Sequence, residues 1–167
     1  MCIKDILREF IRYASEHHCF MLGIVMVLIL ISILSTREQN RIWLFLYAAV
    51  VAYMTLLNRT YWARRVSLIP FSSYRLLFVS NYFRRQILNN IFLFIPLGTI
   101  LSRLRPKWNT ALILVLVSVG IELLQLITAR GLLETDDVIS NSIGGLIGLT
   151  VGLMCKYAGS FFRTLNK

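Results

Sequence analysis

Five long apolar runs limit what this chain can fold into. Each run is 16 to 21 residues long, and short polar or basic stretches separate them. A helix needs roughly 20 mostly apolar residues to cross a hydrocarbon core. Each run therefore predicts a membrane-crossing helix, and the shorter ones extend into their flanks. The runs cover residues 19–35, 42–57, 87–102, 109–129 and 138–155.

The composition supports a membrane protein. Of the 167 residues, 57% are hydrophobic and only 16% are charged, and the mean hydropathy is +0.68, outside the range of ordinary soluble domains. The net charge of +10 is spread between the apolar runs. This distribution indicates contact with anionic lipid headgroups and excludes a nucleic-acid stripe. The three cysteines follow neither disulfide nor metal-ligand spacing, so we predict no metal site and no cofactor.

The sequence predicts an all-α polytopic membrane helical bundle of about five transmembrane helices. Residues 1–18 place apolar side chains at offsets of three and four, which predicts an amphipathic helix on the membrane surface. Residues 19–57 supply the first two transmembrane helices. Residues 58–155 form a domain with three more, and residues 156–167 form a basic tail.

An arginine-rich loop precedes the third predicted helix. Residues 58–86 contain six arginines, several aromatic residues and no acidic residue. We expect part of this loop to lie in the headgroup layer as an interfacial belt or a re-entrant piece. A sixth span over residues 66–83 is the alternative, and the serines, Arg75 and Asn81 within it argue against that.

Polar side chains gather around the end of the fourth predicted helix. Glu122 and Gln125 share one helix face, and a charge at membrane depth costs ~2.5–3.5 kcal/mol on insertion scales. Five spans would bring the loop, the third and fifth helix starts and the end of the fourth to one side of the membrane. We predict a ligand-binding site there, formed by Arg65, Asn90, Glu122, Gln125, Arg130, Asp136, Asp137 and Asn141.

The fifth predicted helix carries a ridge of small residues. Gly144, Gly148 and Gly152 follow one another at a spacing of four. Such a ridge lets another helix approach closely. We predict that the three glycines pack against a helix of the same chain or, as an alternative, join copies in a homo-oligomer.

We predict a multi-pass protein of the cell membrane whose polar site faces outward. Ten basic residues fall on the side of the site and eight on the other, so the positive-inside rule alone does not fix the orientation. The eight lie in short loops and the tail, as membrane anchors do. The arginines of the long loop instead suit an anionic ligand.

Five motifs follow one another between residues 59 and 152. They are Arg65 with Leu68-Ile69-Pro70-Phe71, Asn90 with Phe94-Ile95-Pro96-Leu97-Gly98, Ile121-Glu122-Leu123-Leu124-Gln125, Arg130 with Asp136-Asp137-Val138-Ile139, and Asn141 with Gly144-Gly145 and Gly148. In this order they resemble the VanZ-like family. The resemblance implies a cell-envelope membrane protein linked to susceptibility to glycopeptide and lipopeptide antibiotics such as teicoplanin, and it implies no established reaction. The family usually has an aromatic residue and an acid before the aspartate pair, where this chain has Leu132-Leu133-Glu134.

Two functions of different classes fit these residues. The first is non-enzymatic: Arg65 and Arg130 pair with the phosphate of an anionic lipid or lipid-linked cell-wall precursor, and the other polar groups orient its headgroup. The alternative is a membrane enzyme that acts on a lipid-linked phosphate or sugar by carboxylate acid-base chemistry, with Glu122, Asp136 and Asp137 as catalytic candidates. The polar cluster has no histidine, no activated cysteine and no glycine-rich phosphate loop. We therefore favour binding.

Overall fold

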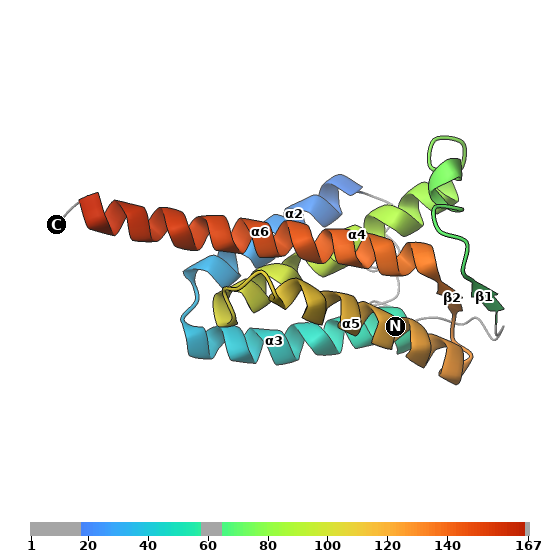
Figure 1. Cartoon of the computed structure of the whole chain (residues 1–167), viewed down its shortest axis with the longest axis horizontal. Coiled ribbons are helices and arrows are strands. Elements are labelled where there is room, and N and C mark those ends of the chain that lie inside the picture. Colours follow the sequence, from blue (N-terminus) through green and yellow to red (C-terminus); the bar gives the residue numbers. More distant parts are fainter. Residues whose placement is uncertain (1–17, 58–64, 166–167) are drawn as a thin grey trace, which may run out of the picture.

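The computed structural model describes residues 18–57 and 65–165. Residues 1–17, which hold most of the predicted amphipathic helix, lie outside this part. The described residues form a bundle of five α-helices (Figure 1), which confirms the predicted all-α membrane bundle. The helices are α2 (His18–Leu34), α3 (Arg37–Ala52), α4 (Asn81–Leu104), α5 (Thr110–Thr128) and α6 (Thr135–Leu165).

The helices differ in how well they suit a membrane. By length and hydropathy, α4, α5 and α6 are each able to cross one. The helices α2 and α3 are shorter, at 17 and 16 residues, and a π-helical turn over Tyr53–Leu57 extends α3. The helix α6 continues through Leu165, so most of the predicted basic tail is helical.

The described part of the arginine-rich loop does not form a sixth span. It begins with β1 (Arg65–Ser67), which pairs in parallel with β2 (Leu132–Glu134) in the connection between α5 and α6. A turn and the 3-10 helix η2 (Tyr74–Leu76) follow β1 and lead into α4. The loop is therefore held against the end of the bundle by backbone hydrogen bonds.

The glycine ridge of α6 lies against α4 of the same chain. A Cβ atom at Gly144 would overlap the carbonyl oxygen of Ile91, and one at Gly148 would overlap that of Ile95. Contact positions rise together along both helices, so α4 and α6 run parallel. The missing side chains let the two backbones touch, and this contact sets the two helix starts side by side.

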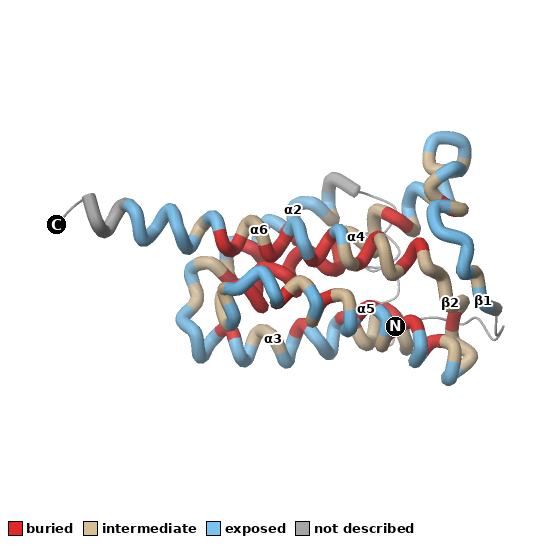
Figure 2. Tube along the Cα trace, viewed as in Figure 1, coloured by how far each residue is buried: buried red, intermediate tan, exposed pale blue. Residues whose placement is uncertain are grey.

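The helix α4 forms the centre of the bundle. Every residue from Phe92 to Ser102 is buried, and α4 contacts α2, α3 and α6. Figure 2 shows the buried stretches on α4 and on the middle of α6, while the outer faces are exposed. Those outer faces carry large apolar side chains such as Phe45, Leu112 and Ile127. An apolar exterior around a packed core is expected where lipid surrounds the protein.

Candidate functional site

The polar site lies at the end of the bundle where α4 and α6 begin and α5 ends (Figure 1). The helix α5 stops at Ala129, whose φ of 52° is left-handed and turns the chain toward β2. The strand pair sets Arg65 opposite Leu132 and Ser67 opposite Glu134. Two connections that are distant in sequence thereby meet over the helix ends.

Asp136 holds the loop between β1 and α4. Its Oδ1 accepts a hydrogen bond from the Phe71 amide at 2.5 Å, and its Oδ2 accepts from the Ser73 amide at 2.7 Å and from the Ser72 hydroxyl at 3.1 Å. These bonds stabilise a turn in which Phe71 has a φ of 63°, a left-handed value that non-glycine residues rarely adopt. Both carboxylate oxygens serve the fold, so Asp136 acts as a positioning residue.

A second set of hydrogen bonds involves Ser140, which lies one turn beyond Asp136 on α6. Ser140 donates to the Asp136 carbonyl oxygen, and its hydroxyl lies 2.8 Å from the Tyr74 hydroxyl. Burial raises the pKa of Tyr74, the Asp136 and Asp137 charges raise it further, and the Ser140 hydrogen bond lowers it in part. The loop is thus tied to α6 at two levels.

Hydrogen bonds link three acidic residues near the start of α4. The Gln86 amide nitrogen donates to Glu134 Oε2 at 2.8 Å and to Asp137 Oδ1 at 3.0 Å. Glu122 Oε2 accepts from the Glu134 backbone amide at 3.1 Å. Glu122 and Asp137 are each only 2% exposed. Buried carboxylates repel one another unless donors or cations surround them, and the Gln86 side chain and the Glu134 backbone amide supply donors here.

Amide side chains line the next turn inward. Asn141 donates to the Ser118 hydroxyl at 3.0 Å. Asn90 lies one helical turn beyond Gln86, as Asn141 lies one turn beyond Asp137, so the two asparagines belong to the facing surfaces of α4 and α6. Four buried amide atoms here and nearby have no hydrogen-bond partner among the described residues, and each costs ~1–3 kcal/mol when left so. They are Asn89 Oδ1, Asn90 Nδ2, Gln125 Oε1 and Asn141 Oδ1.

Gln125 and Arg130 face the end of α3. Gln125 donates to the Thr55 carbonyl oxygen at 3.1 Å, and Arg130 Nη1 donates to the Leu56 carbonyl oxygen at 3.4 Å. These two predicted site residues therefore join α5 to the π-helical turn. The Arg65 side chain lies outside the described part of the chain, although its backbone belongs to β1.

The structure places four predicted site residues on the surfaces where α4, α5 and α6 meet and a fifth, Asp136, against the loop beside them, and it adds partners that sequence analysis missed. The five are Asn90, Glu122, Asp136, Asp137 and Asn141. The missed partners are Tyr74, Gln86, Ser118 and Ser140. A signal for Gln86 was present, because it precedes Asn90 by four positions and so shares its helix face. In the described part of the chain, no group of three or more His, Cys, Asp or Glu side chains is arranged to hold a metal ion.

The fold and this site define a helical membrane protein with a buried polar site at one end of its helix bundle. The VanZ/LLP1 family matches residues 43–156, and the chain belongs to this family. The chain is 33% identical over 123 residues to Protein VanZ of Enterococcus faecium, over 70% of this chain and 69% of that protein. No solved structure matches the chain significantly. The family predicted from the spaced motifs is confirmed.

Proposed function

We propose that this protein binds the headgroup of an anionic lipid or lipid-linked cell-wall precursor, without turnover, and thereby modulates susceptibility to glycopeptide and lipopeptide antibiotics such as teicoplanin. It would be a multi-pass protein of the cell membrane with the polar site facing outward. Membership of the VanZ/LLP1 family and the likeness to Protein VanZ support the antibiotic role. The binding role needs support from the site itself.

Two buried amide atoms without a hydrogen-bond partner among the described residues, Asn90 Nδ2 and Asn141 Oδ1, carry the proposal. Burying polar atoms without hydrogen-bond partners does not stabilise a fold, and an unpaired polar group in the hydrocarbon region costs several kcal/mol. Asn90 Nδ2 is a donor and Asn141 Oδ1 is an acceptor. A sugar or amide headgroup offers both kinds of partner. The pair therefore suits a ligand richer in hydrogen-bonding groups than a bare phosphate.

Charges around the site fit an anionic ligand that carries hydroxyl or amide groups. Arg75, Arg84 and Arg85 are exposed on the loop and on the first turn of α4, at the end of the bundle that holds the polar site, and would form its rim. Arginine binds phosphate with paired hydrogen bonds. The buried carboxylates of Glu122 and Asp137 lie inside this rim and accept hydrogen bonds. The phosphate would thus stay at the rim while polar groups of the headgroup reach inward.

A membrane enzyme remains the second candidate because Glu122 and Asp137 are buried carboxylates of different helices that are linked through Glu134 and Gln86. Two buried carboxylates in different surroundings are the arrangement that acid-base catalysis uses. Asp136 fits this chemistry less well, since the loop occupies both of its oxygens. The enzyme hypothesis requires a lipid whose amount changes when the protein is present.

The test replaces Asn90 with leucine and compares it with Ser142→Ala, whose hydroxyl bonds only within α6, to Val138, among the described residues. Removing an unsatisfied amide should leave the free energy of unfolding unchanged or higher. At matched abundance, Asn90→Leu should abolish the change in teicoplanin response and weaken the binding of a polyprenyl diphosphate, measured by native mass spectrometry, by about tenfold or more. Ser142→Ala should keep both. An asparagine that serves only the fold would give the reverse pattern, with lower stability and intact function per molecule.

Lipid profiles from the same cells separate binding from catalysis. We would compare cells that carry wild type, Asp137→Asn and an empty vector. Identical profiles together with an altered teicoplanin response support the binding proposal. A lipid that appears or disappears only with the wild type would replace it with the enzyme.

A further inference from the structure

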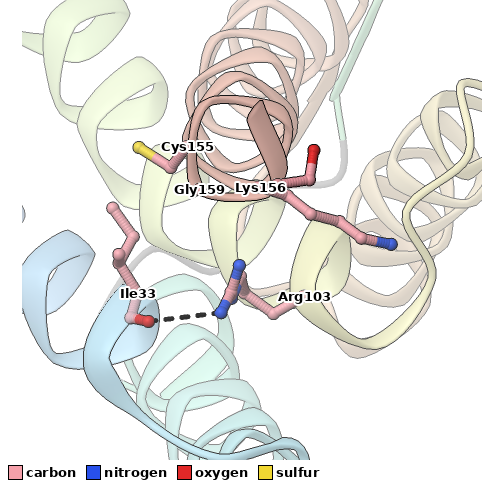
Figure 3. A pocket seen from close by; sticks show the side chains of 6 residues that line it. Ile33, Arg103, Cys155, Lys156 and Gly159 are labelled. Carbon is pink, nitrogen blue, oxygen red and sulfur yellow. Dashed lines mark hydrogen bonds between the residues drawn. The ribbon is translucent and has the colours of Figure 1, made fainter. Parts of the chain in front are cut away.

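A second polar feature lies at the opposite end of the bundle. The ends of α2, α4 and α6 enclose an open groove of about 640 Å³ (Figure 3). Arg103 reaches across it from α4, and its Nη2 donates to the Ile33 carbonyl oxygen at 3.3 Å. Figure 3 shows Arg103 between Ile33 and Lys156. Two cationic side chains from different helices therefore share one groove.

This face is basic throughout its described part. Its only acidic residue there is Glu38, which pairs with Arg41 at 2.8 Å. No acid therefore neutralises Arg103 or Lys156 within the described residues. The described cations of this face are Arg37, Arg41, Arg103, Arg105, Lys107 and Lys156.

We propose that the groove binds an anionic phospholipid of the leaflet on this side, with its phosphate held between Arg103 and Lys156. Arg103 is half-buried, and its hydrogen bond to Ile33 uses one of the five N–H donors of a guanidinium. The others can bind a phosphate in the paired geometry that arginine favours. Lys156 adds a flexible point charge from the facing helix.

Apolar surface continues from the groove toward the middle of the membrane, which favours a lipid over a soluble anion. Ile33 of α2 and Val151 of α6 pack against the same buried cluster, which includes Ile29 and Ile95. On α6, a depression of about 360 Å³ runs from Ile143 to Val151. Cations at the membrane surface with apolar surface directly below match the shape of a phospholipid.

The length of α6 helps to form the groove. The last described buried residue of α6 is Leu153, and the residues from 154 to 161 are half-buried or exposed. Figure 2 shows this exposed end extending beyond the other helices. An extended helix end makes one wall of a groove that α2 and α4 do not close.

The experiment is a titration of the solubilised full-length protein with phosphatidylglycerol or phosphatidylcholine of identical acyl chains, read by native mass spectrometry. The double variant Arg103→Gln/Lys156→Gln is compared with Arg105→Gln/Lys107→Gln, which removes the same charge from the same face outside the groove. The groove variant should bind phosphatidylglycerol about tenfold more weakly, or ~1.4 kcal/mol, while the control stays within about twofold of wild type. Equal losses in both variants would show diffuse attraction to a basic face and overturn the site.

A second variant blocks the groove without changing any charge. A Cβ at Gly159 would meet no atom within 4 Å, and the same holds for Gly120 on α5. Gly159→Phe should therefore fill the groove and weaken phosphatidylglycerol binding, whereas Gly120→Phe should not. Unchanged binding in Gly159→Phe, or displacement of the lipid by inorganic phosphate alone, would overturn the proposal. This test does not involve the polar site at the other end, so its outcome is separate from the antibiotic response.

Discussion

Replacing Gly148 with alanine should push apart the two helices that carry the polar site. The new Cβ would overlap the Ile95 carbonyl oxygen and lie 2.9 Å from the Thr99 amide nitrogen. Both are backbone atoms, so no side-chain rotation relieves the overlap. The helices α4 and α6 would have to separate, which also weakens the 3.2 Å hydrogen bond from the Thr99 hydroxyl to the Gly148 carbonyl oxygen.

The expected loss of stability follows from three contributions. Overpacking a close interface costs ~1–3 kcal/mol, and an interhelical hydrogen bond in a membrane contributes ~0.6 kcal/mol. Alanine favours a helix over glycine by ~0.8–1.0 kcal/mol, which offsets part of this cost. Gly148→Ala should therefore lower the free energy of unfolding by about 1–3 kcal/mol.

Gly120→Ala is the matched control, because a Cβ there meets no atom within 4 Å. It should be neutral or stabilise the protein by up to ~1 kcal/mol, so the two variants should differ by about 1–4 kcal/mol. Reversible unfolding in mixed detergent micelles, followed by circular dichroism, measures both values. Equal stability of Gly148→Ala and Gly120→Ala would refute the close parallel contact between α4 and α6.

Three further predictions concern single contacts. Asp136→Asn replaces one acceptor oxygen with a donor that faces a backbone amide. Hydrogen bonds to charged groups contribute ~1.5–3 kcal/mol, so hydrogen exchange at the Phe71 amide should accelerate about tenfold or more. Unchanged exchange would contradict the role of Asp136. Tyr47→Phe removes a 2.8 Å hydrogen bond to a backbone carbonyl of α4 and should lower the free energy of unfolding by only ~0.6 kcal/mol in the same micelle assay. The pKa of Tyr74 in the folded protein is raised above its ordinary value of 10.0, so the Tyr74 hydroxyl ionises at a lower pH in the unfolded chain than in the folded protein. The stability that depends on this group is therefore intact below pH 10.0 and declines as the pH rises further. Tyr74→Phe should reduce that decline between about pH 9 and about pH 11, and an identical decline in wild type and variant would count against it.

The helices could be predicted because lipid offers the backbone amides no hydrogen-bond partners except the backbone's own carbonyls, so a long apolar run is expected to form a helix. The helix ends were less predictable. The helix α4 begins at Asn81, before its apolar run, and α6 continues to Leu165. At those ends the helices continue beyond the hydrocarbon core through polar residues, and hydropathy does not indicate where such an extension ends.

The contacts that close the site could not be predicted, because they join positions far apart in the chain. The strand pair has only three residues on each side, too few to show the alternation that indicates a strand. Asn40 is a similar case at the other end of the bundle. Its amide nitrogen donates to the carbonyl oxygens of Ser32 in α2 and of Ser35 and Thr36 in the turn before α3, and its Oδ1 accepts from the Ser32 hydroxyl. Thr36 and Gln39 cap the start of α3, ahead of the apolar run predicted from residue 42, and nothing in the sequence indicates the partner of Asn40.

The aspartate pair shows how packing assigns different tasks to identical neighbours. Successive side chains on a helix point about 100° apart, since a turn holds 3.6 residues. Asp136 therefore faces the loop and bonds the Phe71 and Ser73 amides, while Asp137 faces α4 and bonds Gln86. The sequence treats the two as one acidic motif. In the structure Asp136 holds the loop between β1 and α4 in place, and Asp137 ties the start of α6 to α4, so loss of either should disturb the same end of the bundle by a different route.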